Sequence, residues 1–388
     1  MYLILLFLAF VSVFSWNRKS NVLGVFYVDW AEKLLAATQW LDDSVMQNDP
    51  GNWSKKIGFL DFLLNTAVNP RTINTQFLKD ANDDLYRGVR IRYIGHDGDE
   101  NVITSDASAS CTAVAQKRDA VETVEPSLYC EVKFTLTEGY VRDNKENGFG
   151  LQQRINREMQ NSMRKLRECL DLGLYTKAGT LIGANPAAGV GAGGWTTLQQ
   201  LYTADGTIDA RGFDTIKNNM EDNFQNGPFS IIGLGLAREY FNRLAVGNVM
   251  SGGIDYRDVM SQFGMAFYKD HFTTTALGAA DRVIVASPGL SQFYQYNLYA
   301  GNDFSKDVAI KDLLVRTTIQ DPIYPIRYDL IIDWDKNCTN GNGHNGAWTF
   351  RLFTFYDLWT IPEKAFGDTY GELNDFNGLC GYLITEGT

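Results

Sequence analysis

The longest regular pattern of apolar and polar positions in this chain lies at residues 151–177. Apolar side chains recur there every three or four residues, no proline interrupts the segment, and its only glycine lies near the end. The spacing predicts one amphipathic helix, which would be roughly 40 Å long at 1.5 Å per residue. Its apolar stripe consists of Ile155, Met159, Met163, Leu166, Leu170 and Leu174.

Basic side chains crowd the rest of this predicted helix, and two interpretations of them stay open. They form a solvated surface that pairs with acidic neighbours, or they face packaged nucleic acid, whose phosphates bind Lys and Arg. The residues concerned are Arg154, Arg157, Arg164, Lys165 and Arg167.

Two segments before the helix, LYRGVRIRYIG and SLYCEVKFTLTEGY, alternate between apolar and polar positions as half-buried strands do. A polar, weakly patterned stretch separates them. We predict an extended two-stranded loop at residues 85–137, with its strand arms at 89–94 and 129–136. Because a two-stranded ribbon is marginal on its own in water, the loop is expected to find its partners on another subunit. Residues 22–84, which precede it, are predicted to be mainly helix and loop.

The region after the helix mixes several patterns. The glycine-rich segment 179–194 lacks the Lys-Ser or Lys-Thr of a phosphate loop and is predicted to be a flexible connection. In residues 211–300, RGFDTIKNNMEDNF and LAREYFNRLAVGN predict helices, while FSIIGLG, GMAFYKDHF and DRVIVASPG predict extended segments. The following LSQFYQYNLY is expected to be a helix or turn. Finally, YPIRYDLIIDWD and AWTFRLFTFYDLWTIP predict strands joined by an Asn- and Gly-rich hairpin-type connection.

The chain begins with an apolar run, MYLILLFLAFVSVFSW, that is short for a membrane span. Three interpretations are open. The run is a signal or anchor, a buried or partner-binding arm, or translated sequence upstream of the real start. Because such a run exposed on a soluble subunit would promote aggregation, we expect residues 1–20 to be dispensable.

The formal net charge of −11 argues against a protein whose whole surface grips nucleic acid, although a local basic face remains compatible with it. No CxxC pair occurs, which disfavours zinc sites and thioredoxin-like motifs. We expect reduced thiols in a protein assembled in the cytoplasm. The alternative is that Cys111 and Cys130 face each other on the extended loop. The five cysteines are Cys111, Cys130, Cys169, Cys338 and Cys380.

No cofactor or metal site is assigned, because no group of residues has the required spacing. The turn HDGDEN carries Asp97, Asp99 and Glu100 but lacks the full EF-hand pattern, so a solvated turn is favoured over a calcium loop. The histidines stand alone, without an HxxxH or HExxH partner. They are His96, His271 and His344.

No catalytic residue is assigned either. The motif G-x-S-x-G of serine hydrolases does not occur, and Ser287-Pro288-Gly289 follows a predicted strand without forming the elbow. A glycosidase needs two carboxylates about 5 to 9.5 Å apart. The candidates are Asp329, Asp333 and Asp335, but aspartate is also common in turns and at strand ends.

The order of these segments resembles that of the major capsid proteins of tailed bacteriophages, which have the Hong Kong 97-type fold. The resemblance is one of order, length and texture. It covers most of the chain apart from the apolar leader. It implies an α+β fold with an N-terminal arm, an extended two-stranded loop, a long spine helix, a peripheral sheet and a mixed α/β axial domain. The implied divisions are the leader at 1–20, the arm at 21–84, the extended loop at 85–137, the peripheral domain with the spine helix at 138–211, the axial domain at 212–320 and the return strands at 321–388.

The resemblance also implies a function. Such a chain is a non-enzymatic coat protein that self-assembles into hexamers and pentamers of an icosahedral shell enclosing double-stranded DNA. Its implied partners are copies of itself, portal and scaffold proteins, and packaged DNA through weak non-specific contact. No cofactor is implied, nor a membrane in the mature form, and the location is the virion capsid after assembly in the bacterial host cytoplasm. An encapsulin-like nanocompartment shell protein is a near neighbour. The competing interpretation is an exported surface or carbohydrate-active protein, which the leader and the 13% aromatic content favour.

Overall fold

A computed structural model of the chain describes the backbone over eleven stretches. The apolar leader, the turn at 97–100 and His344 lie outside them, as do Cys111 and the whole of the predicted helix LAREYFNRLAVGN. None of the described helices is long and apolar enough to cross a membrane. The described residues are 57–66, 73–77, 89–93, 120–137, 148–198, 211–223, 227–234, 264–299, 315–339, 345–361 and 377–384.

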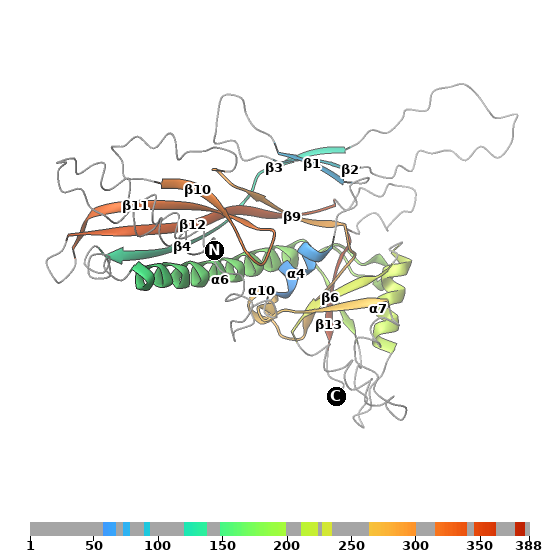
Figure 1. Cartoon of the computed structure of the whole chain (residues 1–388). Helices are drawn as coiled ribbons and strands as arrows, with labels where there is room; N and C mark the ends of the chain where they lie inside the picture. The colour runs from blue at the N-terminus through green and yellow to red at the C-terminus, as the bar shows by residue number, and fades with distance from the viewer. Residues whose placement is uncertain are drawn as a thin grey trace, which may run out of the picture.

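The predicted amphipathic helix is α6 (Gly148–Thr180), which runs through the middle of the molecule (Figure 1). It begins three residues earlier and ends three residues later than the pattern indicated. Every member of the predicted apolar stripe is at most 1% exposed. The prediction of a helix with one buried stripe is therefore confirmed.

A five-stranded antiparallel sheet covers that stripe, and α6 lies along one of its faces (Figure 1). The long strand β12 pairs with β4 on one side, and on the other side first with β11 and then with β9. Its inward residues Trp348, Phe350 and Leu352 are at most 3% exposed, and the rings of Phe350 and Phe134 stack 4.5 Å apart. The strands are β10 (Val315–Gln320), β11 (Arg327–Thr339), β12 (Asn345–Thr360), β4 (Leu128–Thr137) and β9 (Ser291–Tyr296).

The extended loop differs from the expected two-stranded ribbon. Strand β2 (Val89–Tyr93) pairs with β1 (Ile73–Phe77) and with β3 (Ala120–Val124), which makes a separate three-stranded sheet. The second predicted arm, 129–136, is strand β4 and pairs with β12 instead. The expected pairing of these two arms was wrong because alternation identifies a half-buried strand without identifying its neighbour.

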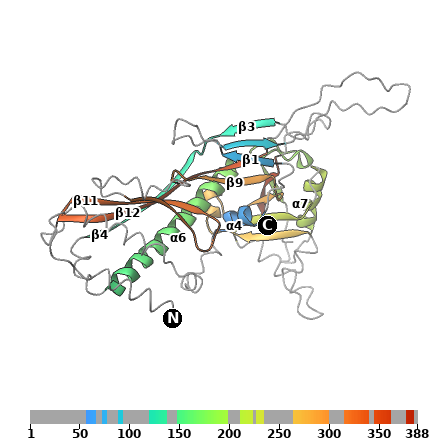
Figure 2. The same ribbon diagram turned by 45° about the horizontal axis from the view of Figure 1, so that its top comes forward.

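A second five-stranded sheet stands near the C-terminal half of α6, between α4 and α7 (Figure 2). Its strand directions are mixed, and its strand order is β5-β13-β8-β6-β7. The Tyr175 hydroxyl of α6 donates to the carbonyl of Ile232 in β6, 3.1 Å away. The strands are β5 (Trp195–Leu198), β13 (Leu379–Ile384), β8 (Arg282–Ala286), β6 (Phe229–Gly233) and β7 (Met265–Lys269), and three helices accompany them, namely α4 (Gly58–Asn65), α7 (Arg211–Asp222) and α10 (Thr273–Leu277).

Most local expectations for residues 211–300 hold within the described residues. Helix α7 buries Phe213, Ile216 and Met220 completely, and FSIIGLG contains the fully buried strand β6. The segment LSQFYQYNLY, expected to be a helix or turn, contains strand β9 and so corrects that prediction. Its residues gain a ladder of hydrogen bonds with β12, which local pattern does not reveal. Taken together, the described residues form an α+β fold, as predicted.

The glycine-rich segment 179–194 is an ordered turn and not the flexible connection that was predicted. A 3₁₀ turn, η3 (Pro186–Ala188), follows α6, and Asn185 bridges to Val190. The Gly193 amide donates a hydrogen bond to the carbonyl of Ile182 at 2.8 Å. Gly193 has a φ of 73°, a backbone conformation that favours glycine. The glycines here permit tight reversal of the chain.

Candidate functional site: the buried anchors of the long helix

Of the residues considered as catalytic candidates, Asp329 and Ser287 are buried, and Asp335 lies among the residues whose side chains the structure does not describe. Asp329 is fully buried, and its carboxylate accepts hydrogen bonds from the amides of Leu298 (2.6 Å) and Tyr299 (3.3 Å) and from the Thr318 hydroxyl (2.8 Å). It holds the chain after β9 against the sheet, and burial raises its pKa to about 6. Ser287 is only 3% exposed. Within the described residues, no group of His, Cys, Asp and Glu has the arrangement of a metal site.

The polar features that do converge are anchors that tie α6 to its surroundings. The first is an ion pair between Arg167 on α6 and Asp321 in the turn between β10 and β11. The guanidinium Nε lies 2.7 Å from the carboxylate Oδ2, and the two side chains are 3% and 0% exposed. Arg167 was expected on the basic surface of the helix, and that expectation is corrected here.

The other basic residues of the helix are more accessible. Arg154 pairs with Glu158 one turn later at 2.7 Å, whereas Arg157 and Lys165 are exposed. Arg154 thus has the acidic neighbour expected of a solvated surface, whereas the exposure of Arg157 and Lys165 is compatible with either of the two interpretations, and Arg167 belongs to neither.

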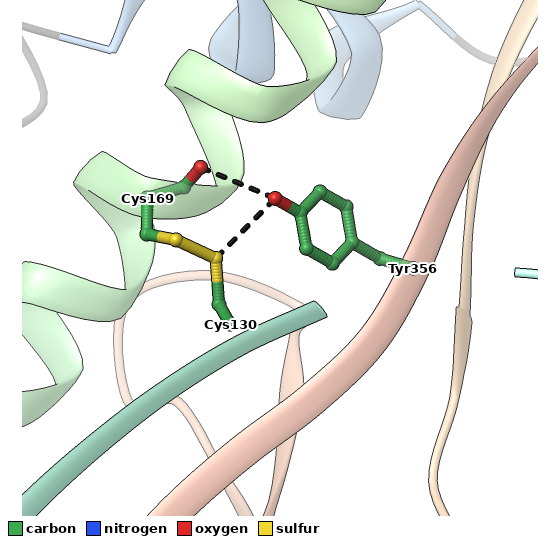
Figure 3. The surroundings of a disulfide bond; sticks show 3 residues. All are labelled: Cys130, Cys169 and Tyr356. Atoms are coloured by element: carbon green, nitrogen blue, oxygen red, sulfur yellow. Dashed lines mark hydrogen bonds between the residues drawn. A yellow bond between two sulfur atoms is a disulfide. The ribbon is translucent and has the colours of Figure 1, made fainter. Parts of the chain in front are cut away.

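The second anchor is a disulfide between Cys130 of β4 and Cys169 of α6 (Figure 3). Their Cα atoms are 6.2 Å apart, within the range that a disulfide requires. The Tyr356 hydroxyl from β12 points at the pair and lies 3.3 Å from the Cys130 sulfur and 3.2 Å from the Cys169 carbonyl (Figure 3). A disulfide sulfur carries no hydrogen, so the hydroxyl is the donor to both.

The disulfide contradicts the expectation of five reduced thiols. That expectation rested on the compartment, whereas the packing of β4 against α6 brings two cysteines together that lie 39 residues apart. Cys130 also has a partner other than Cys111. Cys380, on β13, is a free and buried thiol, as expected.

The third anchor joins the C-terminal part of α6 to β12. The Lys177 ammonium donates to Asp357, whose carboxylate is 1% exposed. The same carboxylate accepts from the amide and the hydroxyl of Ser127, at 2.9 Å and 2.8 Å, just before β4 begins. One aspartate thereby fastens the helix, β12 and the entry to β4 together.

The fourth anchor fixes α4, the described helix nearest to the N-terminus, in place. The amide of Phe59 donates to Asp270 Oδ2 at 3.0 Å, and the amide of Leu60 donates to Asp171 Oδ1 at 2.8 Å. Asp171 belongs to α6, and Asp270 follows β7. Both aspartates are fully buried.

On the face of the large sheet away from α6 lies an aromatic cluster, here called the outer patch: Tyr129, Glu131, Arg351, Phe353 and Phe355. Tyr129 is 45% exposed, and its ring centroid lies 4.9 Å from that of Phe355. Its hydroxyl donates to Glu131 at 2.6 Å, as does Arg351. Burial, followed by the bond to Glu131, raises the pKa of Tyr129 to about 12. The patch presents aromatic rings around a neutralised carboxylate.

Comparison with known proteins gives similarity in structure alone. No family model matches the chain, and no curated protein matches it. The capsid asymmetric unit of Cyanophage A-1(L) is 11% identical, covers 87% of this chain and 95% of its own, and has a TM-score of 0.47. The capsid of Myoviridae Phage XM1 is 10% identical, with 85% and 92% covered and a TM-score of 0.33.

The capsid of Cyanophage P-SCSP1u is 7% identical, with 80% and 86% covered and a TM-score of 0.36. All three are structures of phage capsids. No residue role is transferred from these structures to this chain.

Sequence reasoning found the apolar stripe of α6 but missed all four anchors. Each joins residues far apart in the chain, such as Leu60 and Asp171, separated by 111 residues. The available signal was polar residues at positions that bordered apolar stripes. Asp171 and Arg167 directly follow the stripe residues Leu170 and Leu166.

Proposed function

We propose that this chain is a major capsid protein of the Hong Kong 97 type, which assembles with copies of itself into hexamers and pentamers of an icosahedral shell. The observation that carries the proposal is the contrast between a firmly tied body and a separate small sheet. In the body, α6 is fastened to β4, to β12, to the β10–β11 turn and to α4. A subunit body that is tied together at four places keeps its shape when neighbouring subunits contact it on several sides.

The small three-stranded sheet supports the proposal because it has few partners among the described residues of its own subunit. Strands β1, β2 and β3 each have five residues and, in the part of the chain that is described, pair only with one another. Three short strands are at the lower limit of independent stability in water, so a covering surface would stabilise this sheet. We assign that role to a neighbouring copy, over which the extended loop lies.

The outer patch favours contact between proteins. Tyrosine, phenylalanine and arginine are enriched where proteins meet, and a closed shell repeats one such contact by symmetry. Tyr129 is the more exposed of the two large hydrophobic residues that stand out at the described surface, at 45% against 38% for Ile323. The patch is therefore a candidate contact between subunits.

The remaining parts of the proposal concern the contents and partners of the shell. The enclosed molecule is double-stranded DNA, held by weak non-specific contact because the chain carries a net charge of −11. Portal and scaffold proteins complete the assembly in the host cytoplasm, and the mature protein resides in the virion capsid. The leader at 1–20 is dispensable in this proposal.

The full chain tests the proposal directly. Size-exclusion chromatography with light scattering, followed by negative-stain microscopy, is expected to detect capsomers and closed shells. A folded monomer at every concentration and ionic strength would contradict the proposal. Nuclease-protected DNA inside particles purified from infected cells separates a capsid from a nanocompartment, which would contain protein cargo.

A further inference from the structure

Helix α4 is capped by two side chains from distant parts of the chain. Its N-cap residue, Ile57, makes no side-chain cap bond of its own. The free amides of the first turn donate instead to Asp270 and Asp171, over separations of 211 and 111 residues. At Gly58 an added Cβ would lie 2.6 Å from the carbonyl oxygen of Lys269, so the helix start rests directly on that backbone. The start of α4 is therefore held by the carboxyl groups of Asp171 and Asp270 and packs against the backbone at the end of β7.

The two carboxyl groups are both fully buried. Asp171 Oδ2 is buried and has no hydrogen-bond partner among the described residues. The two carboxyl groups bind successive amides of α4, those of Phe59 and Leu60, and therefore lie close together. Two carboxylates are both acceptors, so one proton between them supplies the missing bond. Burial raises the pKa of Asp171 well above its usual range, and the negative charge of Asp270 raises it further.

Asp270 accepts hydrogen bonds from two backbone amides and Asp171 from one, so Asp270 is the better placed of the two to hold a negative charge. Burial raises its pKa as well, but the hydrogen bond from Asp171 and the amide of Phe59 act in the opposite direction. It also accepts from the amide of Phe272 at 2.7 Å, at the start of α10. A protonated Asp171 and an ionised Asp270 thus keep the hydrogen bonds from Phe59, Leu60 and Phe272 and give Asp171 Oδ2 a partner.

The titratable side chains around Asp171 and Asp270 are mainly carboxylic acids and tyrosines. Lys269 and His271 flank Asp270 in the chain, and His271 is exposed. Arg167, one turn before Asp171 on α6, is occupied by Asp321. The titratable groups that interact with the pair, or with Asp61 beside it, are Asp61 of α4, Tyr175 of α6, Tyr268 of β7, Tyr356 of β12 and Tyr324 of the β10–β11 turn.

We propose that the docking of α4 against α6 and β7 is proton-linked, so that the docked state holds one proton between Asp171 and Asp270 which the released state gives up. Release exposes both carboxyl groups to water, where each ionises near pH 4. If docking takes up one proton, the docking constant falls about tenfold for each unit of rising pH above that value. The segment around α4 is therefore held firmly in acid and progressively less firmly in base.

Hydrogen exchange of the full chain, read by mass spectrometry on a peptide covering 57–66 between about pH 5 and pH 9, measures this dependence. The intrinsic exchange rate of the same peptide in denaturant provides the correction for pH. In the wild type, corrected protection of the peptide is expected to fall with rising pH, by up to about tenfold per unit. Protection that is flat or rises with pH overturns the proposal.

Two variants sharpen the test. In Asp171→Asn, the amide oxygen still accepts from Leu60 and the amide nitrogen donates to Asp270, so protection should become independent of pH. Asp61→Asn removes a nearby carboxyl group that does not belong to the pair, and it should keep the wild-type dependence. An Asp171→Asn protein that retains the full dependence contradicts the proposal.

A second measurement decides the matter if Asp171→Asn fails to fold. The infrared spectrum of the wild type at neutral pH should contain the carbonyl band of a protonated carboxylic acid in a dry environment. Its loss on raising the pH should coincide with the loss of protection in the 57–66 peptide. Absence of this band at neutral pH would overturn the shared proton.

Discussion

Arg167 and Asp321 form a buried ion pair that joins the middle of helix α6 to the turn between strands β10 and β11. The Asp321 carboxylate also accepts from the amides of Ile323 and Tyr324, at 2.9 Å and 3.2 Å, and from the Tyr328 hydroxyl at 3.3 Å. The aspartate shapes the turn, and the arginine balances the charge that this buried turn requires.

The pair predicts the effect of removing one partner. Arg167→Met keeps a side chain of similar length but leaves Asp321 buried without a counter-charge, so we expect a loss of about 3–5 kcal/mol in the free energy of unfolding. Denaturant unfolding of the full chain measures it. The control is Arg157→Met on the exposed surface of the same helix, for which a change within about 0.5 kcal/mol is expected. Equal effects of the two substitutions would contradict the assigned role.

The disulfide between Cys130 and Cys169 should be a principal covalent support of the body. The chain-entropy relation gives about 4 kcal/mol for closing a loop of this length, since the two residues are 39 positions apart. Cys169→Ser should lower the unfolding temperature under oxidising conditions. With reductant present, the wild type and the variant should unfold together. A difference in unfolding temperature that persists in reductant would show that Cys169→Ser destabilises the protein by a cause other than loss of the disulfide.

The contact between Gly173 and Tyr356 predicts that replacing a helical glycine by alanine lowers the stability of this protein instead of raising it. Alanine in a helix is normally favoured over glycine by about 1 kcal/mol. At Gly173, however, an added Cβ would collide with the Tyr356 hydroxyl oxygen. We expect Gly173→Ala to destabilise the protein by about 1–3 kcal/mol.

Tyr356→Phe in the same chain tests the cause of that loss. It removes the clashing oxygen, and the nearest remaining ring atom lies 3.2 Å from the new Cβ. Thermal unfolding of both single variants and the double variant gives the coupling between the sites. Additive effects would exclude the clash as the cause.

The part of the fold that the sequence predicts well is the part that depends on local periodicity. The stripe from Ile155 to Leu174 repeats over about five helical turns, and only a buried helix face accounts for such a repeat. In β4, alternation correctly places Cys130 and Leu136 on one side of a strand. It does not determine whether β2 or β12 lies beside that strand, because either partner satisfies the same alternation.

The anchors depend on how separate elements pack, which local pattern does not contain. Arg167 lies beside the apolar stripe, at a position where a helix can meet either solvent or another element. Its partner Asp321 follows 154 residues later and carries no local mark of burial. In the same way, Cys169 pairs with Cys130 only because β4 packs against α6 at the position of Cys169. Such contacts follow from tertiary packing.

Asp329 predicts how stability depends on pH. Burial raises its pKa to about 6 in the folded protein, above the usual value for an unfolded chain. The stabilisation from its proton is therefore fully present below about pH 4 and is lost as the pH rises through about 6. The shift corresponds to about 3 kcal/mol. Asp329→Asn should remove this loss, so that the variant gains stability over the wild type between about pH 4 and pH 7.

Unfolding midpoints measured at a series of pH values check this prediction. Asp333→Asn is the matched control, because Asp333 lies on the same strand and is only half-buried. It should leave the pH dependence in place. A constant difference between wild type and Asp329→Asn at every pH would contradict the assignment.

The register of β2 and β3 allows the extended loop to be shortened without disturbing the strands. Tyr93 and Ala120 face each other directly in the antiparallel ladder. Residues 94–119 can therefore be replaced by Asn-Gly, which forms the tight turn that such a pair requires. If the extended loop contacts a neighbouring copy, the shortened chain should remain folded and lose the ability to form shells.

Thermal unfolding and light scattering of the shortened chain separate the two effects. The unfolding temperature of the subunit should change little, since α6 and its anchors lie outside the replaced residues. Shell formation should fail or stop at capsomers. The matched control replaces 94–119 with a Gly- and Ser-rich segment of equal length, which keeps the reach of the loop and removes its sequence. Normal shells from the Asn-Gly chain would mean that the loop is not a subunit contact, and failure of both chains would locate the contact in the sequence of the loop rather than in its length.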